Sequence, residues 1–215
     1  MKTIIKYSIL FLVTMMTFWS CSKASGHGSF TMILSGSVHG QLDPCGWKKN
    51  PLGGLSRRYV KINELRKDGI DPIILDAGDL FFSTKKINST NKSSEIYRAK
   101  AILEGYQKIG CDAINIGHYE LLNGLTFLNK MQRDTDISFL SANLKSVKDS
   151  VLLFPPYKII ERGNIKIGII GVTNLLPDTM KAVIAEDYIE ACNKYSEELS
   201  DEVEIVVALV NTDRS

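Results

Sequence analysis

The chain has 215 residues, which suits one large α/β domain or a fragment of a larger protein. Its apolar fraction of 44% and charged fraction of 23% are those of an ordinary globular protein. The net charge is only +2 and the Lys and Arg residues are scattered, so nothing predicts the basic footprint of a nucleic-acid-binding protein, and no nucleic-acid partner is expected.

Residues 1–20 have the pattern of an export signal, because lysines precede an apolar run that is too short for a comfortable membrane helix. The following sequence F-W-S-C-S resembles a bacterial lipoprotein processing site and makes Cys21 the expected lipidated residue. Residues 21–29 are rich in Ser, Gly and Lys and predict a tether. The alternative is a plain N-terminal membrane anchor. Either interpretation predicts an exported protein of the cell envelope, and the first adds a lipid anchor in the outer or cytoplasmic membrane, facing the periplasm or the exterior.

Strands and helices alternate along residues 30–215, which predicts a layered α/β fold. The expected strands are 30–34, 73–75, 113–116, 139–142, 157–160, 165–172 and 204–210. The expected helices are 55–67, 95–109, 124–132 and 180–200. Gly69 and Gly110 stand where helix C-terminal glycines are common, and the polar segment 83–94 predicts a long loop near a site.

Residues that can bind a metal ion follow three of the predicted strands. The segment I-I-L-D-A-G-D at 73–79 ends in Asp76 and Asp79, and His39 and His118 come directly after two other strands. The carboxyl ends of the strands are where open α/β sheets build their sites. Imidazole and carboxylate together suit Zn, Mn or Fe, and a carboxylate that bridges two ions serves phosphoester hydrolysis.

Five motifs in order resemble the 5′-nucleotidase branch of the calcineurin-like metallophosphoesterases: V-H-G-Q-L, G-G-L-S-R-R, L-D-A-G-D, I-G-H-Y-E-L-L-N-G and S-A-N-L. The resemblance runs from about Phe30 to the C-terminus. It implies a four-layer β-sandwich flanked by helices, here incomplete at the C-terminus, so that 30–215 would be a partial domain. It also implies two divalent ions in intact relatives, a small phosphorylated, nucleotide-like substrate, and attack by metal-bound water or hydroxide.

Carried over residue by residue, the resemblance implies metal ligands at His39, Asp79 and His118. His39 matches the histidine of the family's Asp-x-His motif, and Asp79 matches the aspartate that bridges both metals. His118 stands where the family has asparagine and would serve as a substitute ligand. Asp76 is expected beside the site or as a turn-capping residue.

The family's Gly-Asn-His-Glu motif makes Tyr119 and Glu120 the expected catalytic residues, and its Ala-Asn segment makes Asn143 the expected substrate-binding residue. Several positions depart from the family pattern. Ser37 replaces a metal-binding aspartate, Tyr119 replaces a histidine, and Asn211 stands where a strand-end histidine is usual. Tyrosine is a poor acid–base group at neutral pH, with a pKa of about 10.

Two interpretations of function therefore stay open. The first is an exported, metal-dependent phosphoesterase, or the N-terminal part of one. The second is a catalytically degenerate surface lipoprotein that uses the fold for binding. Cys45, in the loop D-P-C-G-W-K, could enter the site as a soft ligand or redox thiol, or could be incidental to a turn in which Trp47 packs.

Overall fold

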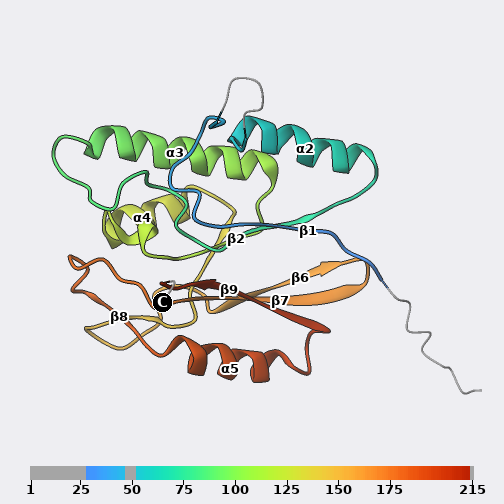
Figure 1. Ribbon diagram of the computed structural model, residues 1–215. Coiled ribbons are helices and arrows are strands. Elements are labelled where there is room, and N and C mark those ends of the chain that lie inside the picture. Colours follow the sequence, from blue (N-terminus) through green and yellow to red (C-terminus); the bar gives the residue numbers. More distant parts are fainter. Residues whose placement is uncertain (1–27, 47–51, 214–215) are drawn as a thin grey trace, which may run out of the picture.

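The computed structural model in Figure 1 describes residues 28–46 and 52–213. Its strands are β1 (Met32–Ser35), β2 (Ile73–Asp76), β3 (Ala113–Asn115), β4 (Ser138–Leu140), β5 (Leu144–Ser146), β6 (Tyr157–Arg162), β7 (Ile165–Thr173), β8 (Val183–Ala185) and β9 (Ile205–Asn211). Its helices are α2 (Leu55–Lys67), α3 (Lys92–Ile109), the short 3₁₀-helix η1 (Tyr119–Leu121), α4 (Leu125–Arg133) and α5 (Tyr188–Leu199).

Two sheets stack between two helical layers (Figure 1). The first sheet is parallel, in the order β1-β2-β3-β4, and α2, α3 and α4 cover its outer face. The second sheet has the order β6-β7-β9, with an antiparallel β6–β7 hairpin and β9 parallel to β7, and α5 covers its outer face. β5 and β8 form a small antiparallel pair. The predicted four-layer α/β sandwich flanked by helices is confirmed.

Alternating side chains of the strands fill the spaces between these layers. Ile73 and Leu75 of β2 point into the core between the two sheets, whereas Ile74 joins the core beneath the helices. All three are fully buried, which explains why this strand is a continuous apolar run in the sequence. Ile167 and Ile169 of β7 complete the core between the sheets from the other side.

The predicted helix ends depend on glycine. Gly110 closes α3 in the left-handed conformation with φ of 76°, and Gly69 follows α2 with φ of 80°. Both bond their N–H groups back to carbonyl groups of the last turn, which is the usual way to satisfy the end of a helix. These two glycines confirm the predicted helix C-termini, whereas α3 begins three residues earlier than predicted, at Lys92.

The predicted helix 180–200 is wrong in its first part. Residues Val183–Ala185 form strand β8 instead, paired with β5, and α5 begins only at Tyr188. Asp187 fixes this start, because its carboxylate accepts hydrogen bonds of 2.8 Å from the N–H groups of Ile189 and Glu190.

The expected signal at 1–20, the lipidated Cys21 and most of the tether lie outside the described residues. Within 28–46 and 52–213, no helix is long and apolar enough to cross a membrane.

Candidate functional site

The segments that follow β1, β2, β3, β7 and β9 meet at one edge of the sandwich and line an open cavity of about 530 Å³. We call it the strand-end cavity. Its lining residues are Ser37, His39, Asp79, Lys85, His118, Tyr119, Leu175, Thr212 and Asp213. The structure thus brings the three predicted metal ligands, His39, Asp79 and His118, together with Tyr119.

Backbone hydrogen bonds hold the first two loops side by side beyond the ends of their strands. The N–H groups of Ser37 and His39 donate to the carbonyl groups of Gly78 and Asp79, at 2.8 and 2.9 Å. Gly78 itself adopts a φ of 100°, and a Cβ there would lie 3.0 Å from the Asn115 carbonyl oxygen. The D-A-G-D motif therefore needs glycine at this position to pack against β3.

Three residues of this cavity adopt left-handed backbone conformations that non-glycine residues rarely use. The φ angles are 52° at Ser37, 48° at His39 and 57° at Asp79. Such conformations cost about 1–3 kcal/mol each and persist where the surrounding structure imposes them, often at functional sites. Because all three strained residues line the same cavity, this cavity is a candidate functional site.

Glu120 holds the Asp79 loop in this shape from below. Its fully buried carboxylate accepts hydrogen bonds from the N–H groups of Asp79 (2.9 Å), Leu80 (2.7 Å) and Gly117 (3.0 Å). Burial, and then the nearby charge of Asp79, raises the pKa of Glu120 to about 7. Glu120 was predicted to be catalytic, but its carboxylate has no exposed surface and does not line the cavity. We therefore reassign it as a residue that positions Asp79.

Tyr119 lies between the two histidines of the cavity. Its ring centroid is 4.5 Å from that of His39 and 5.7 Å from that of His118. Its N–H donates to the Asp79 carboxylate at 3.0 Å, which ties the third loop to the second. Burial, and then the charge of Asp79, raises the pKa of the Tyr119 phenol. The phenol therefore stays protonated at neutral pH and can donate a hydrogen bond, but it does not serve as a base.

Asn143 was predicted to contact substrate, and the structure places it elsewhere. Its amide nitrogen donates to the carbonyl groups of Thr173 (2.6 Å) and Glu186 (2.8 Å), and its amide oxygen accepts from the Thr173 N–H (3.1 Å). The side chain is fully buried and does not line the strand-end cavity. We reassign Asn143 as a residue that joins β7 to the segment after β8.

Asn211, at the end of β9, accepts a hydrogen bond from the N–H of His118 at 3.3 Å. Its side-chain oxygen also lies 3.3 Å from the Thr173 hydroxyl, which donates to it. Asn211 is mostly buried, with 7% of its surface exposed, and supports the His118 loop from behind. The end of β9, which the sequence predicts to lie near the site, therefore contacts the His118 loop, but Asn211 does not line the cavity.

Asp76, three residues before Asp79, faces away from the strand-end cavity. Its carboxylate accepts hydrogen bonds from the hydroxyl groups of Ser35 (2.6 Å) and Tyr106 (2.9 Å) and from the Gly78 N–H (3.0 Å). Arg58 donates to both of those hydroxyl groups and approaches the carboxylate. The predicted turn-capping role of Asp76 is confirmed by its bond to Gly78.

Cys45 does not line the strand-end cavity, so the structure gives no support to a soft metal ligand there. The residue is exposed, and its backbone forms an isolated antiparallel bridge with Leu52. Trp47 lies outside the described residues.

The metal-binding capacity of the cavity falls short of the two-ion site that the resemblance implies. Within the part of the chain that the structure describes, no group of three His, Cys, Asp or Glu side chains is arranged to hold a metal ion. The cavity offers His39, Asp79 and His118 from three loops, and Ser37, where the resemblance implies a further carboxylate, also lines it. A catalytic zinc site needs three protein ligands that converge on one ion, plus water. His39, Asp79 and His118 line the same cavity but are not arranged in such a group, so they do not fit the site as they stand.

Sequence reasoning missed four residues of the cavity: Lys85, Leu175, Thr212 and Asp213. Lys85 lies in the polar segment predicted to be a loop near the site, and that was the available signal. Leu175 follows the longest strand of the second sheet, and no local pattern distinguishes it. Thr212 and Asp213 follow β9, whose end becomes part of the site only because β9 pairs with β7.

The architecture defines the class of protein. A solved calcineurin-like phosphoesterase from Bacillus subtilis superimposes with a TM-score of 0.66 at 20% identity, over 86% of this chain and 63% of that one. The 5′-nucleotidase precursor from Thermus thermophilus gives a TM-score of 0.68 at 24% identity, over 84% of this chain and 36% of that one. The fold is that of the calcineurin-like phosphoesterases.

The sequence relationship makes the assignment narrower. The chain is 33% identical over 169 residues to the 5′-nucleotidase of Vibrio cholerae, which covers 76% of this chain and 28% of that protein. No protein-family model matches the chain. The resemblance to the 5′-nucleotidase branch is confirmed, and the chain is homologous to a part of these enzymes. It spans 22% to 35% of the length of the curated relatives it matches, and 28% of the Vibrio cholerae enzyme.

Proposed function

We propose that the chain is a phosphoesterase-like protein of the 5′-nucleotidase type, whose strand-end cavity takes a small phosphate ester such as a nucleotide. One observation carries the proposal: His39, Asp79 and His118, from three separate strand ends, line one cavity in a chain homologous to 5′-nucleotidases. The name of the relatives suggests the substrate class, and the strand-end cavity is the binding site that we propose for it.

Several side chains of the cavity can bind an anionic ester, beside the two carboxylates of Asp79 and Asp213. Lys85 is exposed at the cavity and forms no ion pair with the described residues, so its ammonium group is free to pair with a phosphate oxygen. Tyr119 supplies a protonated phenol as a second donor. The imidazoles of His39 and His118 flank this phenol and face the same space.

The resemblance implies dependence on a divalent metal (Mn, Zn or Fe), with two ions in intact relatives. His39, Asp79 and His118 are the residues that would contact it. Such an ion would supply bound hydroxide as the nucleophile. The described residues provide no three-ligand group, so we derive no hydrolytic step through a metal ion from them.

A second function, phosphate-ester binding without turnover, is favoured by the substitutions around the cavity. Ser37 and Tyr119 replace an expected carboxylate and an expected histidine, and Asn211 supports the His118 loop through a backbone hydrogen bond instead of lining the cavity. A catalytically degenerate protein would keep Lys85 and Tyr119 as binding groups.

Turnover by the full chain separates the two functions. We would measure phosphate release from AMP and from an aryl phosphate, with Mn or Zn added or chelated, together with bound metal. Metal-dependent release establishes the phosphoesterase. Absence of turnover, with activity emerging in the double variant Ser37→Asp, Tyr119→His, establishes the degenerate form. Absence of turnover and of AMP binding in both proteins contradicts both functions.

We also propose export and anchoring in the cell envelope through a lipid on Cys21, which the signal pattern of residues 1–20 supports. The wild-type chain should fractionate with membranes, and Cys21→Ser should release it or leave its signal unprocessed. Recovery of the variant in the membrane fraction at its normal processed mass would contradict lipidation.

A further inference from the structure

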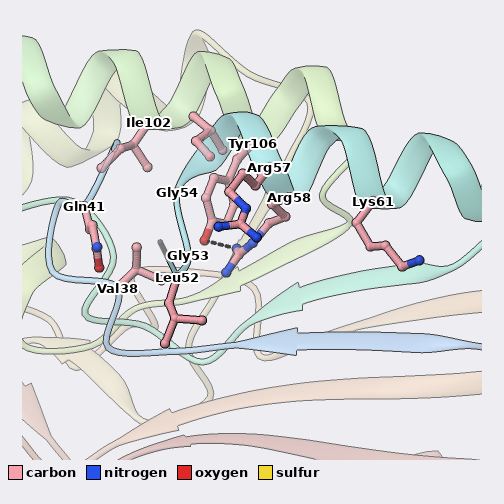
Figure 2. A pocket seen from close by; sticks show the side chains of 11 residues that line it. Val38, Gln41, Leu52, Gly53, Gly54, Arg57, Arg58, Lys61, Ile102 and Tyr106 are labelled. Atoms are coloured by element: carbon pink, nitrogen blue, oxygen red, sulfur yellow. Dashed lines mark hydrogen bonds between the residues drawn. The ribbon is translucent and has the colours of Figure 1, made fainter. Parts of the chain in front are cut away.

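A second cavity, of about 440 Å³, lies between α2, α3 and the loop that follows β1 (Figure 2). We call it the basic cavity. Its lining residues are Val38, Gln41, Leu52, Gly53, Gly54, Leu55, Arg57, Arg58, Lys61, Ile102 and Tyr106. None of them lines the strand-end cavity, although Val38 and Gln41 flank His39 and Gly40 in the sequence.

Positive charge dominates the basic cavity. Arg57, Arg58 and Lys61 come from the first two turns of α2, and the described lining residues include no Asp or Glu. Arg57 forms no ion pair within the described part of the chain, and Lys61 has only a solvent-exposed contact of 3.1 Å with Glu64. Surface pairs of this kind contribute little, so two of the three cations remain available to a ligand.

Arg58 differs because it is already fixed. Its guanidinium donates to the Ser35 hydroxyl at 3.0 Å and to the Tyr106 hydroxyl, and lies 5.3 Å from the centroid of the Tyr106 ring. Figure 2 shows Tyr106 and Ile102 approaching from α3 and the basic side chains from α2. These contacts hold the Arg58 side chain in place at the edge of the cavity, whereas Arg57 and Lys61 have no such contacts within the described residues.

The first turn of α2 carries positive charge, which is unfavourable beside the positive end of the helix dipole. Its first turn has no acidic residue, no side chain caps it, and two arginines stand there instead. Cations near the positive end of a helix are unfavourable, and an anion at that place is favourable. An anionic ligand in the basic cavity would offset both the helix dipole and the repulsion among the three cations.

Apart from Gln41 and the Tyr106 hydroxyl, the rest of the lining is apolar. Val38, Leu52, Leu55 and Ile102 contribute aliphatic side chains, and Tyr106 contributes its ring. Small-molecule sites are typically cavities of about 300–1,000 Å³ with apolar walls and a few placed polar groups. The basic cavity matches this description in volume and in lining.

We propose that the basic cavity binds a small organic phosphate, with the phosphate group against Arg57 and an apolar or aromatic body against Val38, Leu55 and Ile102. Lys61, which extends away from Arg57 toward Glu64 (Figure 2), would turn toward the phosphate when it binds. The site is separate from the strand-end cavity. A ligand in it would contact Val38 and Gln41, the neighbours of the segment that carries His39.

Calorimetric titration tests this site, with AMP, adenosine and inorganic phosphate as probes and without divalent metal. The full chain would carry His39→Ala and Lys85→Gln, so that the strand-end cavity is disabled. In this background AMP should bind more tightly than adenosine or phosphate alone. Adding Arg57→Gln and Lys61→Gln should weaken AMP binding about tenfold or more, because two charge-assisted hydrogen bonds are lost.

The matched control is Lys67→Gln with Lys100→Gln, which removes the same charge from exposed positions of α2 and α3 outside both cavities. This pair should leave AMP affinity within about twofold, since its charges are distant and screened. Melting temperatures would show that both double variants fold. The proposal is overturned if AMP does not bind in the background protein, or if the two pairs of substitutions weaken binding equally.

Discussion

Residues of the loop that follows β1 line both cavities, but the two cavities are built from different materials. The strand-end cavity consists mostly of loop residues, three of them with positive φ, and mixes imidazole, carboxylate and ammonium groups. The basic cavity is built largely on helices α2 and α3 and combines cations with apolar walls. Strained loops bring reactive groups of both signs together, whereas helices hold charge of one sign against an apolar surface. The first arrangement is suited to a catalytic site, and the second is suited to binding an anionic ligand.

Asp76 and Asp79 show the same contrast within one motif. Asp79 has φ of 57° and contributes to the strand-end cavity, and its loop depends on Glu120 for support. Asp76 is fully buried and bonds Ser35 and Tyr106, the two residues that also hold Arg58 at the basic cavity. The D-A-G-D segment thus supports both cavities, and substitutions on its two sides should separate them.

The largest effect is expected for Glu120→Ala. The N–H groups of Asp79, Leu80 and Gly117 would lose their acceptor in a buried place, which should lower the free energy of unfolding by about 3 kcal/mol or more. Urea unfolding measures this change. AMP binding at the strand-end cavity should be lost because its loop would relax. Glu104→Ala, at an exposed site on α3, is the control, and equal stability of the two variants would refute the support role.

Tyr106→Phe tests the other side of the motif. It removes the hydroxyl that donates to Asp76 and accepts from Arg58, and should lower the free energy of unfolding by about 1–2 kcal/mol. It should also loosen Arg58 and weaken AMP binding in the basic cavity, while binding at the strand-end cavity stays unchanged. Tyr97→Phe, on the exposed face of α3, is the matched control for unfolding. A loss of affinity at both cavities would show that they are not independent.

Lys85→Gln should change affinity without changing stability. Measured in the Arg57→Gln, Lys61→Gln protein, so that only the strand-end cavity binds, AMP affinity should fall about tenfold with the loss of a charge-assisted hydrogen bond. The free energy of unfolding should stay within about 0.5 kcal/mol, as is usual for a surface substitution. Lys86→Gln removes the same charge one residue away, outside the cavity, and should have no effect on affinity. Equal losses in the two variants would exclude a specific contact at Lys85.

Much of the fold could be predicted because its signals are local. The apolar run of β2 and the glycine after α3 are visible in a few neighbouring residues, and they predicted elements that the structure confirms. β5 and β8 were missed because each has three residues of which only one is buried, so neither shows the apolar run that identified β3 and β4. Their side chains carry no periodicity long enough to detect.

The candidate site could be predicted in part for a similar reason. His39, Asp79 and His118 each follow a strand, so parallel strands alone bring them to one edge of the sheet. The side-chain amide of Asn143 donates to the carbonyl groups of Thr173 and Glu186, which are 30 and 43 residues away. No local sequence pattern reveals these two hydrogen bonds. The basic cavity was hidden for the same reason, since Arg57 and Lys61 acquire their apolar neighbours only when α3 packs on α2.

The smallest expected effect concerns pH and the buried carboxyl of Asp76. Burial raises the pKa of Asp76 in the folded protein, although bonds from Ser35, Gly78 and Tyr106 and the charge of Arg58 act against this rise. The folded state then holds the proton more tightly than the unfolded state, whose carboxyl titrates near a pKa of about 3.9. The contribution of this group to stability is therefore full below that pKa and declines as the pH rises through the folded pKa.

The comparison with Asp76→Asn isolates this contribution. The melting temperature of the wild type, relative to the variant, should fall as the pH rises from about 4 and level off once Asp76 is ionised in the folded state. Asp136→Asn, at an exposed site, should show no such trend. If the melting temperature of the wild type instead rose relative to Asp76→Asn with increasing pH, the pKa of Asp76 would be lowered in the folded protein. Arg58 and the three hydrogen bonds would then have a larger effect on this pKa than burial. Asp76 would then be a structural anion that holds Arg58 in the wall of the basic cavity, and the two carboxylates of the motif would both act through their charge.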